Sequence, residues 1–179
     1  MKIEKEVKIL NINVDDIKNK LNELGAVCHG TFFQKRYTYD VKPVNPNKWI
    51  RLRTNGEKTT LTIKEIVNKA RVDGTKEWEI EVSDFEETNN ILLQLGFEYR
   101  NYQENIRTIY TFKNLEIVID KWPKIPEYIE IEGESNDEIL DFVKKLNLDG
   151  NEEVTTEDVA SVYKKYGIDI IKIKELREW

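Results

Sequence analysis

Residues 3–10 read Ile3-Glu4-Lys5-Glu6-Val7-Lys8-Ile9-Leu10, and apolar and charged side chains alternate over most of this run. Successive side chains of a β-strand point to opposite faces of its sheet. The run therefore predicts a strand whose charged face carries Glu4, Glu6 and Lys8. The opposite face, with Ile3, Val7 and Ile9, is apolar.

Seven further runs also predict strands: five of them repeat the period of two, and the other two, residues 32–39 and 102–110, are rich in aromatic residues. These runs are residues 32–39, 48–53, 59–65, 76–82, 102–110, 115–120 and 128–132. Proline and glycine positions such as Asn55-Gly56 and Pro123 separate neighbouring runs, as turns require. The sequence thus predicts about eight strands joined largely by short turns.

Three segments have the apolar spacing of helices, residues 14–24, 85–95 and 139–148, and a last helix is expected at roughly residues 156–166. Acidic or polar residues precede the first three and are suited to accept the free N–H groups of a first helical turn. The first two end in Leu-Gly, where glycine closes a helix in the left-handed conformation. Strands and helices together predict an α+β fold.

The other predicted strands also divide into an apolar and a polar face. The polar faces carry Arg51 and Arg53; Thr60, Thr62 and Lys64; Glu77, Glu79 and Glu81; Arg107; Asp120; and Glu130 and Glu132. For any one strand, a charged face in solvent is the simpler interpretation. Across the set, acids on some strands and bases on others favour convergence inside a closed antiparallel barrel. Buried unpaired ions cost several kcal/mol each, so these charges must match one another or bound ligands.

A divalent metal and a polyphosphate would provide that match. Hard ions such as Mg²⁺ or Mn²⁺ prefer carboxylate oxygens, which pairs of glutamates at i and i+2 of one strand supply. Arginine forks and lysine ammonium groups bind phosphate oxygens. Phosphoryl transfer depends mainly on positioning and electrostatics, so neither a catalytic cysteine nor a catalytic histidine is required.

Composition narrows the function classes. The 179 residues suit one domain spanning residues 1–179, and 28 Lys+Arg against 34 Asp+Glu give a net charge of −6, which argues against general nucleic-acid binding. Cys28 and His29 are the only residues of their types, so we interpret both as structural. Without a long apolar run or a signal-peptide core, we expect a cytoplasmic protein that does not enter membranes, as a monomer or homodimer.

These motifs resemble the CYTH superfamily, also called triphosphate tunnel metalloenzymes, which includes class IV adenylate cyclases and thiamine triphosphatases. The resemblance covers nearly the whole chain, and its elements follow in order. They are Glu4-x-Glu6-x-Lys8, Arg51-x-Arg53, Thr62-x-Lys64, a Glu-x-Glu near Glu79, Arg107 ahead of Tyr110, Asp120, and Glu130-x-Glu132. The first motif alone is weakly specific, whereas the ordered set on strands of matching parity is specific.

The resemblance implies a closed eight-stranded antiparallel barrel that forms a triphosphate tunnel, with helices packed outside. It also implies roles for the residues that match. The implied metal ligands are Glu4, Glu6, Asp120, Glu130 and Glu132; the implied catalytic residues are Glu4, Glu6, Lys8 and Asp120; the implied phosphate ligands are Lys8, Arg51, Arg53, Lys64, Arg107 and either Lys164 or Lys165. Of the acids on residues 76–82, Glu79 and Glu81 are favoured over Glu77 as the family's pair.

Two positions depart from the family pattern. Asn105 stands where a basic residue is common, which predicts a missing or replaced phosphate contact. Arg36 stands where the family often has aspartate, and it either adds positive charge near one tunnel mouth or faces solvent.

The family supports several reactions on one site. We expect hydrolysis of inorganic, nucleoside or thiamine triphosphate with Mg²⁺ or Mn²⁺, and the alternative is cyclisation of ATP to cyclic AMP. A further alternative is a module that binds polyphosphate or nucleotide without turnover. The acidic residues favour catalysis over binding alone, since phosphate binding requires only bases. A purely structural or protein-interaction domain would make no use of either set.

Overall fold

The computed structural model describes residues 2–68, 74–148 and 150–177, and the side chains of residues 2–4 are outside this description. The strands are β1 (Lys2–Glu4), β2 (Glu6–Leu10), β3 (Val27–Asn45), β4 (Lys48–Thr54), β5 (Thr59–Ile66), β6 (Thr75–Val82), β7 (Tyr99–Phe112), β8 (Leu115–Lys121), β9 (Tyr128–Glu132), β10 (Glu153–Thr155) and β11 (Glu175–Leu176). The helices are α1 (Val14–Glu23), α2 (Phe85–Gln94), α3 (Asn136–Lys145) and α4 (Val159–Lys165), with a 3₁₀ helix η1 (Ile170–Lys172).

Every predicted strand and helix has a counterpart in the structure. The caps are local and sequence-encoded, because side chains of Asn13, Asp84, Ser135 and Asp158 accept backbone N–H groups at the four helix starts. The sequence missed the length of β3, which has 19 residues, and the short strands β10 and β11. The expected α+β class is therefore confirmed.

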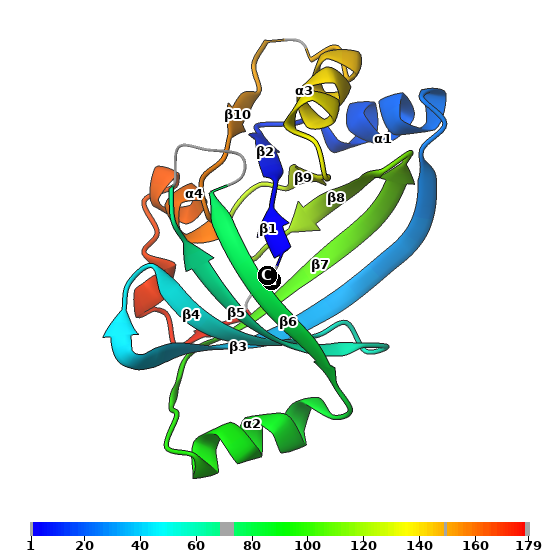
Figure 1. Cartoon of the computed structure of the whole chain (residues 1–179). Coiled ribbons are helices and arrows are strands. Elements are labelled where there is room, and N and C mark those ends of the chain that lie inside the picture. The colour runs from blue at the N-terminus through cyan, green and yellow to red at the C-terminus, as the bar shows by residue number, and fades with distance from the viewer. Residues whose placement is uncertain (1, 69–73, 149, 178–179) are drawn as a thin grey trace.

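The strands form one curled sheet, with β3 and β7 as its long central pair (Figure 1). Its hydrogen-bonded order is β1-β6-β5-β4-β3-β7-β8-β9-β2-β10, antiparallel throughout, while β11 adds to β7 in parallel. In the part of the chain that is described, no strand pair joins the two ends of this path. The closed eight-stranded barrel expected from the sequence is not confirmed, and a curled antiparallel sheet stands in its place.

The N-terminal chain reaches both ends of the curl. Lys5 alone separates β1 from β2, yet β1 pairs with β6 and β2 pairs with β9. Glu4 opposes Thr75 in the first pair, and Glu6 opposes Glu132 in the second. A single extended stretch thus lies beside strands that are far apart in the sheet order.

Helices cover the outer face of the sheet at opposite ends, with α1 and α3 side by side at one end and α2 at the other (Figure 1). Ile17 of α1 and Phe142 of α3 join a cluster with outward side chains of β2, β8 and β9, such as Ile117 and Ile129. Helix α2 packs through Phe85 and Leu92 on β3 and β4. These two cores therefore lie outside the curl, where the apolar strand faces point.

The inward faces are polar, as the alternation predicted. Lys8, Arg36, Arg51, Thr62 and Asp120 are all buried, although none belongs to an apolar cluster. A row of buried ions needs internal partners or ligands. The inside of the curl is consequently the place to look for a functional site.

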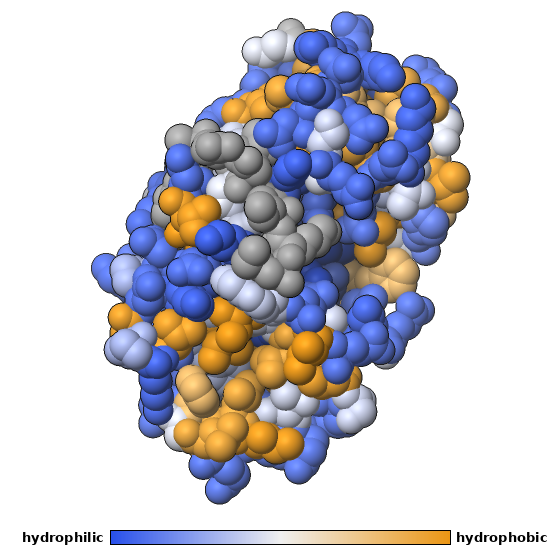
Figure 2. All heavy atoms as spheres, in the orientation of Figure 1, coloured by the Kyte–Doolittle hydropathy of each residue, from blue (hydrophilic) through white to orange (hydrophobic). Residues whose placement is uncertain are grey.

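Figure 2 shows mostly hydrophilic residues over the upper part of the visible face and a gathering of hydrophobic residues lower down, where β6 and α2 lie. Exposed apolar side chains there include Trp78 and Ile80 of β6 and Ile91 of α2. None of the helices in the described ranges is both long and apolar enough to cross a membrane.

The Tyr39 hydroxyl ties β3 to α2, because it donates to Asn89 Oδ1 at 2.8 Å in a buried setting. Tyr39→Phe leaves that acceptor buried and unsatisfied, so the free energy of unfolding should fall by about 1–3 kcal/mol in urea titrations. The matched control is Tyr166→Phe, whose exposed hydroxyl has only a 3.4 Å contact with Asn11. Equal effects of the two changes would contradict this account of α2 docking.

Candidate active site

A cavity of about 530 Å³ lies inside the curled sheet. Inward side chains from most of the strands line it, and the strands hold them at fixed positions because their parity alternates. The charged lining residues are Glu6, Lys8, Arg36, Arg51, Arg53, Lys64, Glu77, Glu79, Arg100, Arg107, Glu116, Glu130, Glu132 and Asp158. Most of the residues predicted from the sequence as site residues are therefore brought together here.

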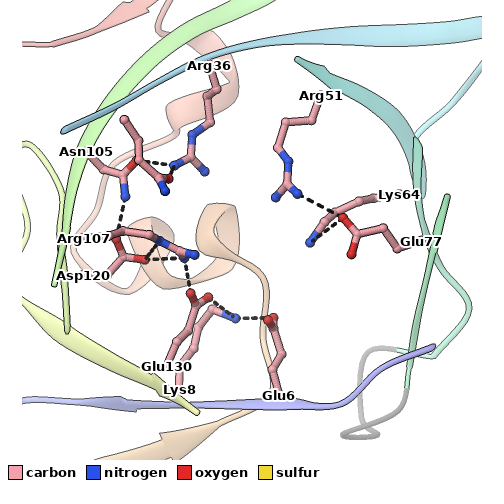
Figure 3. Close-up of polar contacts among 11 residues, drawn as sticks. Glu6, Lys8, Arg36, Arg51, Lys64, Glu77, Asn105, Arg107, Asp120 and Glu130 are labelled. Carbon is pink, nitrogen blue, oxygen red and sulfur yellow. Dashed lines mark hydrogen bonds and ion pairs between the residues drawn. The ribbon is translucent and has the colours of Figure 1, made fainter. Parts of the chain in front are cut away.

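One wall of the cavity is a chain of ion pairs across β2, β9, β8 and β7 (Figure 3). Lys8 Nζ lies 2.6 Å from Glu6 Oε1 and 3.2 Å from Glu130 Oε1. Arg107 also donates to Glu130, and its Nη2 lies 2.6 Å from Asp120 Oδ2. Asp120 is completely buried and accepts a further hydrogen bond from the Asn105 amide.

The charges on this wall stabilise one another. Burial alone would lower the pKa of Lys8, but Glu6 and Glu130 raise that pKa above its ordinary value. Burial would likewise raise the pKa of Glu130, but Arg107 and Lys8 outweigh it and hold the pKa well below its usual range. Both side chains are therefore charged at neutral pH, and the wall is rigidly paired.

The opposite wall, on β4, β5 and β6, carries a second group of charges (Figure 3). Arg51 Nη2 donates to Glu77 Oε1 at 3.0 Å and lies 3.7 Å from Glu79 Oε2. The Thr62 hydroxyl donates to Glu79, and Lys64 Nζ lies 4.0 Å from Glu77 Oε1. The acids here neutralise Arg51 and Lys64 while all four side chains line the cavity.

Apolar side chains also line the cavity. Trp49, Ile66, Val159, Ile170 and Ile171 line it together with the charged groups. Asn101 holds the C-terminal part of this lining, because its amide donates to backbone carbonyls of η1 at 3.1 Å and 3.3 Å. The volume is in the range of pockets that enclose drug-sized organic ligands.

The comparison with protein families agrees with this geometry. The CYTH domain model matches residues 2–163 of the 179. The chain belongs to the CYTH family. Members of this family are triphosphatases or adenylate cyclases and act on small triphosphate substrates, and CYTH triphosphate tunnel enzymes depend on a divalent metal.

Solved structures share the CYTH fold with this chain. The PH1012 protein from Pyrococcus horikoshii OT3 is 28% identical, with a TM-score of 0.74 over 87% of this chain and 96% of that one. A putative adenylate cyclase from Vibrio parahaemolyticus is 14% identical, with a TM-score of 0.69 over 85% and 93%. The putative adenylyl cyclase HpAC1 from Hippeastrum, described as having a dominant triphosphatase activity, is 15% identical, with a TM-score of 0.62 over 94% and 99%. No curated protein matches the chain.

In this CYTH protein, the predicted metal ligands do not form one group. The Glu4 side chain lies outside the described residues. Within the described residues, no three or more His, Cys, Asp and Glu side chains lie close enough together to hold a metal ion. Asp120 and Glu130 are turned toward Arg107, and Asp120 does not line the cavity. The physical reason is that a buried carboxylate takes the nearest guanidinium as its partner.

Glu6 and Glu132 are the predicted metal ligands that remain candidates, although Glu6 already accepts a hydrogen bond from Lys8 at 2.6 Å. They face each other across β2 and β9, and both line the cavity. Glu116 opposes Glu132 on β8 and also lines the cavity, although the sequence interpretation did not single it out. The signal was available, because Glu116 shares the parity of Asp120. Mg²⁺ commonly binds one or two carboxylates and completes its shell with water and substrate phosphates, so this donor set fits it.

The structure places two other sets of predicted site residues away from the cavity. Glu81 is exposed, pairs with Lys58 at 3.1 Å and does not line the cavity, so the inward acids of β6 are Glu77 and Glu79. Neither Lys164 nor Lys165 reaches the cavity. Lys165 instead pairs with Glu153 and Glu157, because it lies on the outward side of α4.

The two departures from the CYTH pattern, Arg36 and Asn105, contact each other. Arg36 is only 5% exposed and lines the cavity, so the alternative that it faces solvent is wrong. Its Nη2 donates to Asn105 Oδ1 and, at 3.1 Å, to Gln34 Oε1. A positive charge on β3 thus lies beside the position on β7 where a base is missing.

Arg107 holds two buried carboxylates, so we expect Arg107→Gln to lower the free energy of unfolding by about 3–5 kcal/mol at pH 7. The low pKa of Glu130 in the folded protein stabilises the fold at pH values above the pKa of the unfolded chain, which is about 4.3. This stabilisation is lost as the pH falls toward the pKa of the folded state. In urea titrations, the difference in the free energy of unfolding between the variant and the wild type should therefore be smaller at pH 3 than at pH 7. An equal difference at both pH values would contradict this. The control Lys144→Gln removes an exposed pair and should have little effect at either pH.

Proposed function

We propose that this CYTH protein hydrolyses a triphosphate with the help of a divalent metal, inside the curl of its sheet. The observation that carries the proposal is the convergence of two oppositely placed sets of charges on one cavity. The β2 and β9 side offers Glu6 and Glu132, while the β4 and β5 side offers Arg51, Arg53 and Lys64. A polyphosphate with bound metal is the ligand class that complements both sets at once.

We further propose that the curl acts as a tunnel. The N-terminal stretch pairs with β6 through β1 and with β9 through β2, which supports a closed arrangement in which β1 and β2 serve as one strand. Enclosure matters chemically, because excluding water strengthens the interaction of Arg and Lys with phosphate oxygens. A tunnel also limits the substrate to a linear chain of phosphates or to a compact organic triphosphate.

In this proposal, Arg51, Arg53 and Lys64 bind the phosphate chain and neutralise the charge that develops on cleavage. Lys8 and Arg107 line the other wall and are available to the same anion, although acidic residues already hold both of them. Asp120 acts by positioning Arg107. The basic groups therefore keep the chain extended for attack by a water molecule at one phosphorus.

Glu6 and Glu132 would hold Mg²⁺ or Mn²⁺, with substrate phosphates and water completing the ligand shell. When bound, such an ion neutralises phosphate charge and polarises the phosphorus–oxygen bonds. The two glutamates serve to fix that position relative to the arginines of β4. Glu116 lies next in the same row and extends the acidic surface.

Hydrolysis is preferred over cyclisation of ATP because it needs only a positioned water molecule. The described triphosphatase activity of HpAC1 belongs to a protein that shares the fold, and it is consistent with this preference. The apolar lining residues, such as Trp49 and Ile170, favour including organic triphosphates among the substrates. ATP cyclisation therefore stays as the second candidate function.

The purified protein should release phosphate from tripolyphosphate, ATP or thiamine triphosphate with Mg²⁺ or Mn²⁺, and chelation should abolish release. The measurement is a phosphate assay over this substrate panel, with cyclic AMP followed in the ATP reactions. Cyclic AMP as the dominant product would assign the cyclase instead. Tight metal-dependent binding with no turnover under any divalent ion would assign a binding module.

Arg53→Ala should lower kcat/KM for the best substrate by a factor of about 10²–10³, as removal of a group that stabilises developing charge does in other enzymes. The melting temperature should stay equal or rise, because Arg51 and then burial lower the pKa of Arg53 to about 9 and so mark a repelled charge. Lys58→Ala, on the exposed side of the neighbouring turn, is the control. An unchanged kcat/KM in Arg53→Ala would contradict the proposed role of Arg53 in phosphate binding.

A further inference from the structure

Arg36 and Arg53 stand directly opposite each other on β3 and β4. Both line the cavity, so the two positive charges share the inward face of the sheet. Like charges at directly opposite positions of an antiparallel pair are destabilising. Two opposed arginines therefore need a physical explanation, whereas a pair of neutral residues at the same positions would need none.

The two arginines differ from Arg51 and Arg107 in their partners, and Figure 3 shows the contacts of Arg36, Arg51 and Arg107. Arg51 and Arg107 bind carboxylates. Among the described residues, Arg36 donates hydrogen bonds only to the neutral amides of Gln34 and Asn105, and its Nε has no hydrogen-bond partner there. Its guanidinium lies 4.5 Å from the centre of the Trp122 ring. For Arg53, the described part of the chain offers no hydrogen bond and no ion pair.

Electrostatics agree with this division. Burial first, and then Arg107 and Arg53, hold the pKa of Arg36 well below its usual range. The pKa of Arg53, at about 9, is still above neutral pH, so its charge persists and the repulsion with it. Two uncompensated guanidinium groups in a mostly paired cavity form a site that gains from an anion.

We propose that Arg36 and Arg53 form a clamp for the terminal phosphate of the substrate, a role that makes Arg36 a further substrate-binding residue. The inference rests on the proposed function, since it assigns one end of the triphosphate. A terminal phosphoryl group presents three non-bridging oxygens and a double charge at neutral to basic pH, whereas an internal one presents two oxygens and a single charge. Two guanidinium forks suit the former, because each makes paired charge-assisted hydrogen bonds.

The stacking of Arg36 on Trp122 and its amide partners preorganise the clamp. Gln34 and Asn105 are both buried, and they fix one guanidinium nitrogen while leaving the charge unneutralised. A carboxylate in either place would have satisfied the arginine and removed its attraction for phosphate. The arrangement therefore orients the side chain without competing with the ligand.

The test is calorimetric binding of tripolyphosphate and of trimetaphosphate in EDTA, so that neither metal nor turnover contributes. Trimetaphosphate is cyclic and has no terminal phosphoryl group. Arg36→Gln should weaken tripolyphosphate binding about ten- to hundredfold, the loss expected for a charge-assisted contact. It should weaken trimetaphosphate binding by a clearly smaller factor. Lys35→Gln, which removes the same charge from the exposed neighbouring position of β3, should change neither.

Thermal melting without ligand provides the readout that separates binding from structure. We expect Arg36→Gln to melt at an equal or higher temperature, since it relieves repulsion from Arg53 and Arg107. Unchanged tripolyphosphate affinity in Arg36→Gln would overturn the clamp. If the melting temperature also fell, Arg36 would be a structural residue. Equal losses for both phosphates would overturn the terminal assignment, and absence of wild-type binding would overturn the clamp altogether.

These outcomes are separable from the proposed function. If the wild type binds tripolyphosphate through Arg36 but releases no phosphate with any metal, the clamp stands and the proposed hydrolase activity is overturned. If the wild type hydrolyses triphosphate and Arg36→Gln has the same KM, the proposed hydrolase stands and the clamp is overturned.

Discussion

The whole structure depends on ions of both signs being turned inward by the alternation of β-strands. Each inward charge carries a desolvation cost, and the fold offsets it by setting Lys8 between Glu6 and Glu130 and by setting Arg107 between Asp120 and Glu130. The apolar faces of the same strands then point outward and pack against α1, α2 and α3. This arrangement reverses the usual position of a core and leaves the interior free for an anionic ligand.

Incomplete matching of these charges is what gives the cavity its chemistry. A fully paired interior would be stable and inert, whereas this one retains Arg36 and Arg53, for which the described residues provide no carboxylate ion pair. Structural pairs such as Arg51 with Glu77 hold their side chains in place around the uncompensated ones. The division between paired and unpaired ions thus separates residues that build the site from residues that await a ligand.

Strand parity made the inward faces predictable from sequence, and so the strands, the four helices and most of the charged lining residues were found. Pairing between side chains was not predictable, because it depends on register and curl. Asp120 has the correct parity but is taken up by Arg107, and Glu81 lies beyond the cavity on a strand whose inward acids are Glu77 and Glu79. Arg36 was ambiguous for the same reason, because its setting depends on Asn105, which lies 69 positions away. Closure of the sheet also depends on long-range pairing of the N-terminal stretch.

The most direct test of the central claim is anomalous diffraction from crystals grown with Mn²⁺ and a non-hydrolysable imido analogue of tripolyphosphate. The account predicts a manganese peak between Glu6 and Glu132, with the phosphate chain extending from it across the cavity to the arginines of β3 and β4. Manganese and phosphate bound on the outer surface, with the inward ion pairs unchanged, would contradict it.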